Sequence, residues 1–143
     1  MVHSRFIGLF AATVFALIPS CSIMKKCSLK DTAWTGEYRM FVADVGTQTS
    51  TVDLRFVSSK EFEMTTRSEM PPHPAMYMNP DGTVDTLPGS TSEWEERGTY
   101  TIKNNTVTLT VTDGPTYILH FTEEGGLVCD RIFGEGPVQF YKK

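Results

Sequence analysis

Apolar and polar residues alternate with a period of two along most of the chain from Trp34 onward. Residues 34–42 show the pattern first, and it returns in residues 51–56, 61–65, 99–103, 107–111, 117–121, 127–133 and 138–141. Alternation of this kind is typical of a strand that buries one face. No window after residue 20 has a sustained helical period with caps. The pattern therefore predicts an all-β chain of about eight short strands.

Turn residues separate these stretches at short intervals. Asn104-Asn105 lies between two of them, and because asparagine tolerates a left-handed backbone, the pair predicts a two-residue β-hairpin turn. Asp113-Gly114, residues 124–126 and residues 134–137 predict further turns. Antiparallel strands joined in sequence by hairpins close most simply into a small up-and-down barrel, because closure removes the exposed edges.

The first twenty residues have a different pattern. Arg5 precedes an uncharged, mostly apolar run over residues 6–19, and Ser20 comes just before Cys21. A charged start, a short apolar run and a small-residue exit are the marks of a secretory signal peptide. A transmembrane span, which needs about 20 apolar residues, and a buried first element of the fold are the alternatives. Residues 18–21, Ile-Pro-Ser-Cys, resemble the lipobox of bacterial lipoproteins, in which the cysteine is lipidated.

This interpretation divides the chain into a lipoprotein signal peptide over residues 1–20, a tether over 21–32 and one barrel domain over 33–143. The whole chain has thirteen basic and seventeen acidic residues, and the predicted signal peptide contains one of them, Arg5. The mature chain would therefore carry twelve basic and seventeen acidic residues. That balance argues against nucleic acid as a partner, since its binding needs a basic patch. The membrane, reached through a lipid on Cys21, is the expected partner.

Two more cysteines remain if Cys21 is lipidated. Cys27 and Cys129 could then form a disulfide in an oxidising compartment. The alternative is a mobile Cys27 and a reduced Cys129 that packs in the core as a small apolar residue. The sequence leaves both open.

One long segment interrupts the strands. Residues 69–92 contain five prolines and several methionines, and a connection of this length is usually functional or disordered. Residues 79–82, Asn-Pro-Asp-Gly, predict a turn within it. Residues 76–78 and 84–87 are therefore expected to form an extra hairpin, either as a lid over one barrel mouth or as a mobile rim loop.

The same segment offers a set of soft metal ligands. Met70, His73, Met76 and Met78 lie within nine positions, and thioether with imidazole is a ligand set that Cu(I) favours. A Cu(I) site is one hypothesis for these residues, and apolar packing of the methionines against the barrel rim is the alternative. No resident cofactor is expected.

Three short stretches carry a family resemblance. Residues 34–38 (W-T-G-E-Y), 51–56 (T-V-D-L-R-F) and 98–102 (G-T-Y-T-I) resemble the lipocalin-like lipoproteins of gut-dwelling Bacteroidetes. That resemblance implies an eight-stranded barrel with a small apolar cavity. The chain is also similar to the amino-terminal barrel of NlpE-type copper-homeostasis lipoproteins, whose Cys-Ala-Asp-Cys-x-Gly turn matches residues 42–46. Valine replaces both cysteines here, so no cysteine-based metal or redox role is carried over.

Catalytic motifs are missing from the sequence. It contains no nucleophile elbow, zinc-protease helix, phosphate-binding loop or dinucleotide fingerprint, and we expect no enzyme activity. Glu93, Glu95 and Glu96 surround Trp94 just ahead of a predicted strand. As a carboxylate cluster they could bind a cation or a polar ligand, but the simpler interpretation is a solvated acidic edge that discourages aggregation between strands.

Two functions of different class remain. The first is a lipid-anchored protein that binds a small apolar or amphipathic ligand in the barrel. The second is a non-catalytic protein-interaction or envelope-stress and metal-sensing module with a fully packed barrel. Candidate cavity residues are Tyr38, Met40, Leu54, Phe56, Tyr100, Ile102, Leu109, Tyr117 and Leu119.

The expected location is the bacterial cell envelope. Ser22, which follows Cys21, lacks the acidic side chain associated with retention in the inner membrane, so the outer membrane is favoured. Residues 22–26 also lack the acidic run linked to surface display in Bacteroidetes. We therefore expect a lipoprotein that faces the periplasm.

Overall fold

The computed structural model describes residues 28–132 and 136–143, and within them the fold is an antiparallel β-barrel. The strands are β1 (Thr32–Val42), β2 (Gly46–Phe56), β3 (Glu61–Met70), β4 (His73–Pro74), β5 (Thr86–Leu87), β6 (Ser90–Lys103), β7 (Thr106–Val111), β8 (Thr116–Phe121), β9 (Leu127–Cys129) and β10 (Val138–Lys142). Eight of them close the barrel in the order β1-β10-β9-β8-β7-β6-β3-β2. The predicted all-β barrel is confirmed. No helix that could cross a membrane occurs in these described ranges.

The chain runs around the barrel in sequence order, as the hairpin pattern predicts. Each barrel strand pairs antiparallel with the next, and the circle closes where β1 meets β10, with Gly36 opposite Phe140. Asn104 and Asp113 have φ of 55° and 56°, the left-handed conformation expected for the β6–β7 and β7–β8 turns. Residues 1–27, which include the predicted signal peptide and Cys21, lie outside the described residues.

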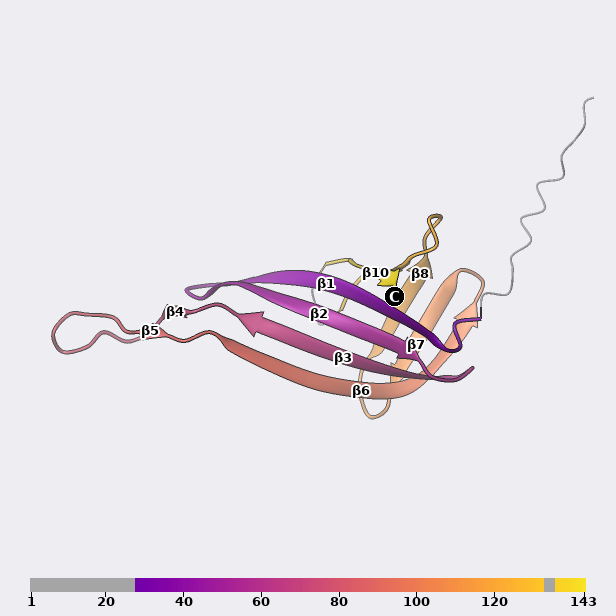
Figure 1. Ribbon diagram of the computed structural model, residues 1–143, viewed down its shortest axis with the longest axis horizontal. Helices are drawn as coiled ribbons and strands as arrows, with labels where there is room; N and C mark the ends of the chain where they lie inside the picture. Colours follow the sequence, from indigo (N-terminus) through magenta and orange to yellow (C-terminus); the bar gives the residue numbers. More distant parts are fainter. Residues whose placement is uncertain (1–27, 133–135) are drawn as a thin grey trace, which may run out of the picture.

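One side of the barrel is much longer than the other because its strands have unequal lengths. β1, β2, β3 and β6 have 10 to 14 residues, whereas β7 to β10 have three to six. The long strands run out past the short ones as a curved four-stranded sheet (Figure 1). We call this extension, residues 37–51, 66–70 and 90–97, the wing.

Several strands are longer than the alternation predicts. β2 begins at Gly46 instead of residue 51, β3 continues to Met70, and β6 begins at Ser90 instead of residue 99. β9 is shorter and ends at Cys129. The extra lengths lie mainly in the wing, where polar side chains such as Ser50, Thr66 and Ser68 interrupt the apolar residues of the inward face.

Glu93, Glu95 and Glu96 therefore lie within β6, and not ahead of a strand as predicted. Among the described residues, this part of β6 pairs on one side only, with β3, because β7 begins its pairing at Gly98. Residues 90–97 of β6 therefore form an open edge of the sheet, as the sequence predicts. Glu93 and Glu95 lie on the outer face, where they form ion pairs with Arg67 and Arg97, whereas Glu96 faces inward.

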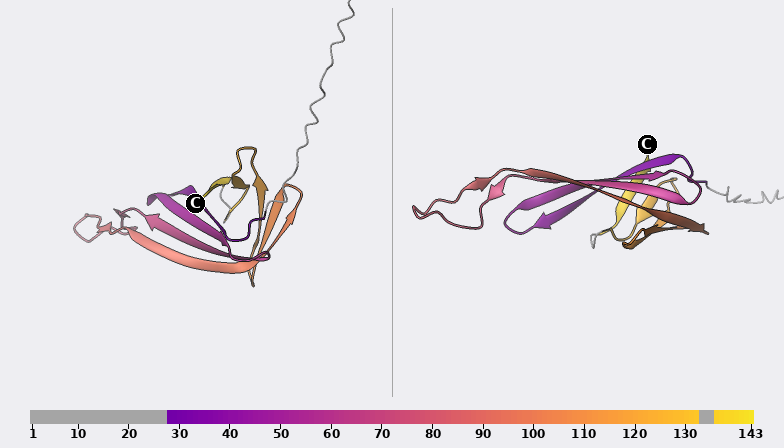
Figure 2. Two further views of the ribbon diagram at one scale, coloured as in Figure 1. Left: turned by 45° about the vertical axis from the view of Figure 1, so that its right-hand side comes forward. Right: turned by 90° about the horizontal axis from the view of Figure 1, so that it is seen from below.

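Residues 71–89 form the predicted extra hairpin, with different pairing strands. β4 and β5 pair His73 with Leu87, and the backbone NH of Asn79 donates to Thr83 O at 2.7 Å across the predicted turn. The hairpin continues the direction of β3 and β6 away from the short strands (Figures 1 and 2). It is thus an outward projection of the wing, and the lid interpretation is wrong.

Candidate functional site at the wing end of the barrel

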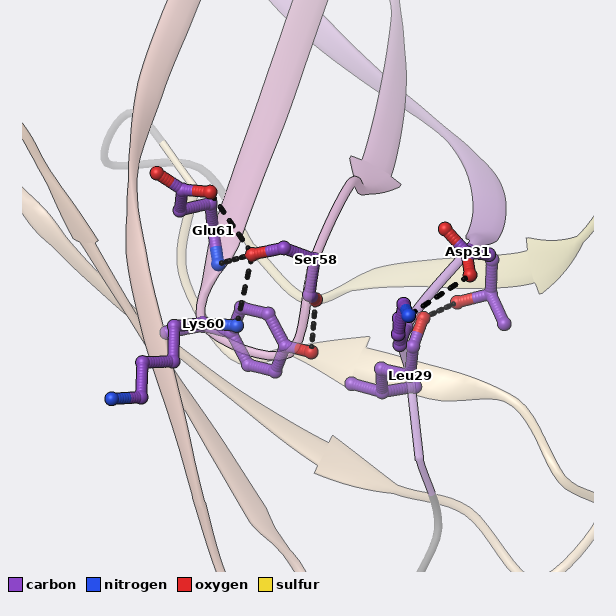
Figure 3. A network of polar contacts seen from close by, with 8 residues as sticks. Leu29, Asp31, Ser58, Lys60 and Glu61 are labelled. Atoms are coloured by element: carbon purple, nitrogen blue, oxygen red, sulfur yellow. Dashed lines mark hydrogen bonds and ion pairs between the residues drawn. The ribbon is translucent and has the colours of Figure 1, made fainter.

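The two ends of the barrel differ in how they are closed. At the end opposite the wing, which we call the base, the β2–β3 turn and the start of β1 form a hydrogen-bonded plug (Figure 3). The hydroxyl of Tyr100 donates to Ser58 O at 2.9 Å, and Ser58 Oγ accepts from the backbone NH of Glu61 at 3.1 Å. Tyr100 also packs edge-on against Phe56, with ring centroids 4.7 Å apart. Burial raises the pKa of Tyr100, which stays a neutral donor.

The wing end has a polar floor. Ser50, Thr66 and Ser68 are the buried polar side chains among the described residues, and all three face inward. Ser50 and Ser68 pair across β2 and β3, and their hydroxyl oxygens lie 2.6 Å apart in a hydrogen bond. Thr66 lies next along β3 and is 0% exposed, yet its Oγ1 has no hydrogen-bond partner. Buried hydroxyls are usually paired, so this oxygen marks a place where a polar group from outside the chain would be stabilised.

A half-buried carboxylate lies beside this floor. Glu96 is diagonal to Thr66 across the β3–β6 pair, a relationship that places such side chains about 7–8 Å apart. The hydroxyl of Tyr117 on β8 donates to Glu96 Oε1 at 3.3 Å and Oε2 at 3.4 Å. Burial raises the pKa of Glu96, although the hydrogen bond from Tyr117 opposes the shift. Burial and the Glu96 charge together raise the pKa of Tyr117, so the phenol stays protonated.

The charge of Glu96 has no cationic partner in the described part of the chain. No ion pair there includes it. Every lysine and arginine of residues 28–132 and 136–143 is exposed, and Arg97, the next residue, points to the outer face toward Glu95 and Glu63. A carboxylate partly withdrawn from water without a counter-charge is unfavourable.

Aromatic side chains complete the inner face around Glu96. Trp94 lies opposite Thr66 on β6 and is half-buried. Tyr38 on β1 lies opposite Ser50 on β2 and packs against the core. The inner side of the wing end thus carries three aromatic rings, one carboxylate and three buried hydroxyls.

Solvent reaches Glu96 through a groove. This groove, of about 610 Å³, lies between β6 and the β7–β8 turn and is lined by residues 95–97 and 111–114. It opens where β6 separates from β7, immediately before Gly98. Glu96 is therefore accessible to a ligand even though the floor beneath it is sealed.

The predicted cavity residues divide between the core and the wing. Leu54, Phe56, Tyr100, Leu109, Tyr117 and Leu119 are buried in the barrel core. Tyr38 and Met40 are half-buried on the inner face of β1 in the wing. Ile102 is 38% exposed at the base end of β6, so it does not line the interior as predicted. Sequence analysis missed Ser50, Thr66, Ser68 and the inward orientation of Glu96, because the polar side chains interrupt the alternation.

The Cu(I) hypothesis concerns residues on or beside the projecting hairpin. Met76 and Met78 are 91% and 68% exposed, so the predicted packing against the rim does not apply to them. His73 Nδ1 lies 3.1 Å from Pro71 O. Within the described ranges, no group of three or more His, Cys, Asp or Glu side chains could hold a metal ion. The methionine-based site stays a prediction.

One predicted pair of cysteines falls partly outside the described residues. Cys27 belongs to the part of the chain that is not described. Cys129 is buried, and its thiol donates to Arg131 O at 3.2 Å. Burial raises its pKa, so this sulfur is held as a neutral thiol.

Comparison with known proteins finds no family model that matches this chain and no match among curated proteins.

Proposed function

We propose that this protein is a lipid-anchored envelope protein that binds a small amphipathic ligand at the wing end of its barrel. The observation that carries the proposal is the buried hydroxyl of Thr66, which lacks a partner on a surface otherwise built of paired hydroxyls and aromatic rings. Because Thr66 is 0% exposed in the ligand-free structure, the side chains that cover it would have to move aside before the polar head of a ligand supplied the missing hydrogen bond. The apolar part of the ligand would lie along the half-buried inner face of the wing, over Tyr38, Met40 and Trp94.

The barrel core below this surface supports a ligand of modest size. Leu54, Phe56 and Phe62 are at most 1% exposed, and the base is plugged by the Tyr100 network. An eight-stranded barrel has room for its own side chains or for one small ligand. Since these core positions are already buried, the binding site lies above the core, on the wing, and not through the length of the barrel.

The proposed anchor fits this arrangement. β1 begins at the base, so a lipid on Cys21 would attach the molecule by the base and leave the wing farthest from the membrane. The seven residues 21–27 can span at most about 25 Å. The binding surface would then face the periplasm, as the outer-membrane location predicts.

Mass spectrometry under non-denaturing conditions tests the binding proposal. Full-length protein isolated from its native envelope should carry a reproducible small molecule, and the Thr66→Val variant should lose most of it. Valine has nearly the same shape, so the variant should fold as well as the wild type. Thr65→Val, on the outer face of the same strand, is the matched control and should keep the ligand. Wild-type protein that is consistently empty, or equal retention by both variants, contradicts the proposal.

A second candidate, a protein-interaction module, is favoured by one observation. The β4–β5 hairpin carries Met76, Tyr77 and Met78, which are 91%, 60% and 68% exposed at the far end of the wing. Exposed apolar side chains gathered on one projection are typical of a contact surface. Replacing all three by serine should leave ligand retention unchanged if the first proposal is right, and should abolish a co-purifying protein partner if the second is right.

A further inference from the structure

We propose that the polar head of the ligand is an organic cation, such as a primary ammonium group, held by Glu96 and the surrounding aromatic rings. This inference rests on the proposed binding function and specifies the class of ligand. Three features of the described residues support it: the charge of Glu96, which has no cationic partner there, the aromatic side chains of the wing end, and the buried, unpartnered acceptor on Thr66.

The first feature is the charge balance of the inner face. Ser50, Thr66, Ser68, Tyr38 and Trp94 are uncharged, and all described lysines and arginines are exposed. Glu96 is thus the charged group on this surface and has a phenol as its hydrogen-bond donor. A fatty acid or phosphate head would meet this carboxylate without any cation to offset the repulsion. An ammonium head would supply the counter-charge that Glu96 lacks.

The second feature is the set of aromatic rings. Tyr117 donates a hydrogen bond to Glu96, Trp94 precedes Glu96 by two residues on the same face of β6, and Tyr38 lies on the inner face of β1, opposite Ser50. Faces of Trp and Tyr attract cations, and the effect grows as water is removed. Aromatic rings beside a carboxylate are the arrangement that recognises organic ammonium groups.

The third feature is the pair of oxygen acceptors that Glu96 and Thr66 place at the wing end. An alkylammonium has three N–H donors. Glu96 can accept one, and Thr66 Oγ1, which lies on a diagonal position across the β3–β6 pair, is an acceptor with no present donor. An alcohol head would satisfy Thr66 and leave the carboxylate without a cation. The ammonium is therefore the head group that satisfies both side chains.

Three probes of equal chain length test the inference on full-length protein in a non-ionic detergent: hexylammonium, hexanol and hexanoate. The chain has two tryptophans, and since Trp34 is 4% exposed in the core, a change in fluorescence on titration would report on Trp94. We expect hexylammonium to bind at least tenfold more tightly than hexanol, and hexanoate more weakly still. Glu96→Gln should remove the preference for ammonium over alcohol. Glu93→Gln, on the outer face of the same strand and outside the groove, should keep it.

The outcomes separate the two proposals. If hexanol or hexanoate binds as tightly as hexylammonium to the wild type, the cation inference is overturned and the ligand-binding proposal stands. The inference is also overturned if Glu96→Gln keeps the full preference for ammonium. If none of the three probes binds, both proposals fail. The comparison of the three probes on the wild type needs no variant, so it holds even if Glu96→Gln folds poorly.

Discussion

The hydroxyl of Tyr117 on β8 donates to both carboxylate oxygens of Glu96 on β6, at 3.3 and 3.4 Å, although the two strands are separated by β7. This contact spans the mouth of the barrel at the point where β6 leaves the short strands. It brings a partly buried charge to the boundary between the core and the wing. Several properties of the protein depend on that position.

The stability of the protein should depend on the protonation of Glu96. Burial raises its folded pKa above the ordinary value of 4.5, so the folded state favours the protonated form. The contribution of Glu96 to the free energy of unfolding is most favourable below its pKa in the unfolded chain. It is lost as the pH rises through its pKa in the folded protein. Glu96→Gln should therefore gain stability relative to the wild type between about pH 4 and pH 7. Urea unfolding of both proteins at about pH 4 and pH 7 gives the difference in their free energies of unfolding. If that difference is the same at both pH values, the prediction is wrong.

The Ser50–Ser68 pair should show strong energetic coupling. Ser68→Ala removes one hydroxyl and leaves the other buried without a partner, which costs about 1–3 kcal/mol. The double variant Ser50→Ala/Ser68→Ala removes both and should recover part of that loss. A double-mutant cycle from urea unfolding measures the coupling. Strictly additive effects of the two substitutions would show that the hydrogen bond does not hold in solution.

Thr66→Val should raise the free energy of unfolding of ligand-free protein by about 1 kcal/mol, because it removes a buried hydroxyl that has no partner. Valine also suits a strand position. The shift of the urea midpoint at constant slope measures the gain. A loss of stability instead would mean that the hydroxyl is already satisfied in the ligand-free protein.

Gly98 should tolerate no side chain. A Cβ there would press against the backbone carbonyl of Thr110 on the paired strand, and neither strand can move without opening the β6–β7 ladder. Gly98→Ala is expected to cost about 3 kcal/mol, the upper end of overpacking effects. Gly136→Ala, whose Cβ would meet no atom within 4 Å, is the control and should change little. Thermal unfolding of both variants gives the comparison, and a stable Gly98→Ala protein would refute the close approach.

The anchor can be tested without reference to the ligand. Cys21→Ala should move the full-length protein from the membrane fraction to the soluble fraction, because the acylation site is lost. Fractionation of cells and immunoblotting measure the distribution. Cys129→Ala is the matched control and should stay with the membrane. Retention of Cys21→Ala in the membrane fraction would argue against a lipid anchor at this position.

The barrel could be predicted from the sequence because its core follows a simple rule. Leu54 and Phe56 alternate with charged residues, and Asn104-Asn105 marks its turn unambiguously. These local signals agree with the closed meander of the structure. Strand type and order needed no long-range information, since neighbouring strands in the barrel are almost all neighbours in sequence.

The candidate site could not be predicted because its residues depart from the apolar–polar alternation that reveals the core. Ser50, Thr66 and Ser68 occupy inward positions where the rule requires apolar side chains, so the predicted strands end early at these residues. The sequence groups Glu96 with Glu93 and Glu95 as one acidic cluster, and only the register of β6 shows that Glu96 faces inward. Departures from a local pattern often coincide with functional positions.

The short strand β9 is the part of the barrel wall with the fewest residues. β9 is three residues long, and β10 meets β1 only over residues 34–36 in the described part of the chain. Elements held by few hydrogen bonds open at lower free energy than the rest of a fold. We expect amide hydrogens of β9 and β10 to exchange faster than those of β2 and β3. Local opening of the barrel would then begin at β9 and β10, while the four long strands β1, β2, β3 and β6 stay paired.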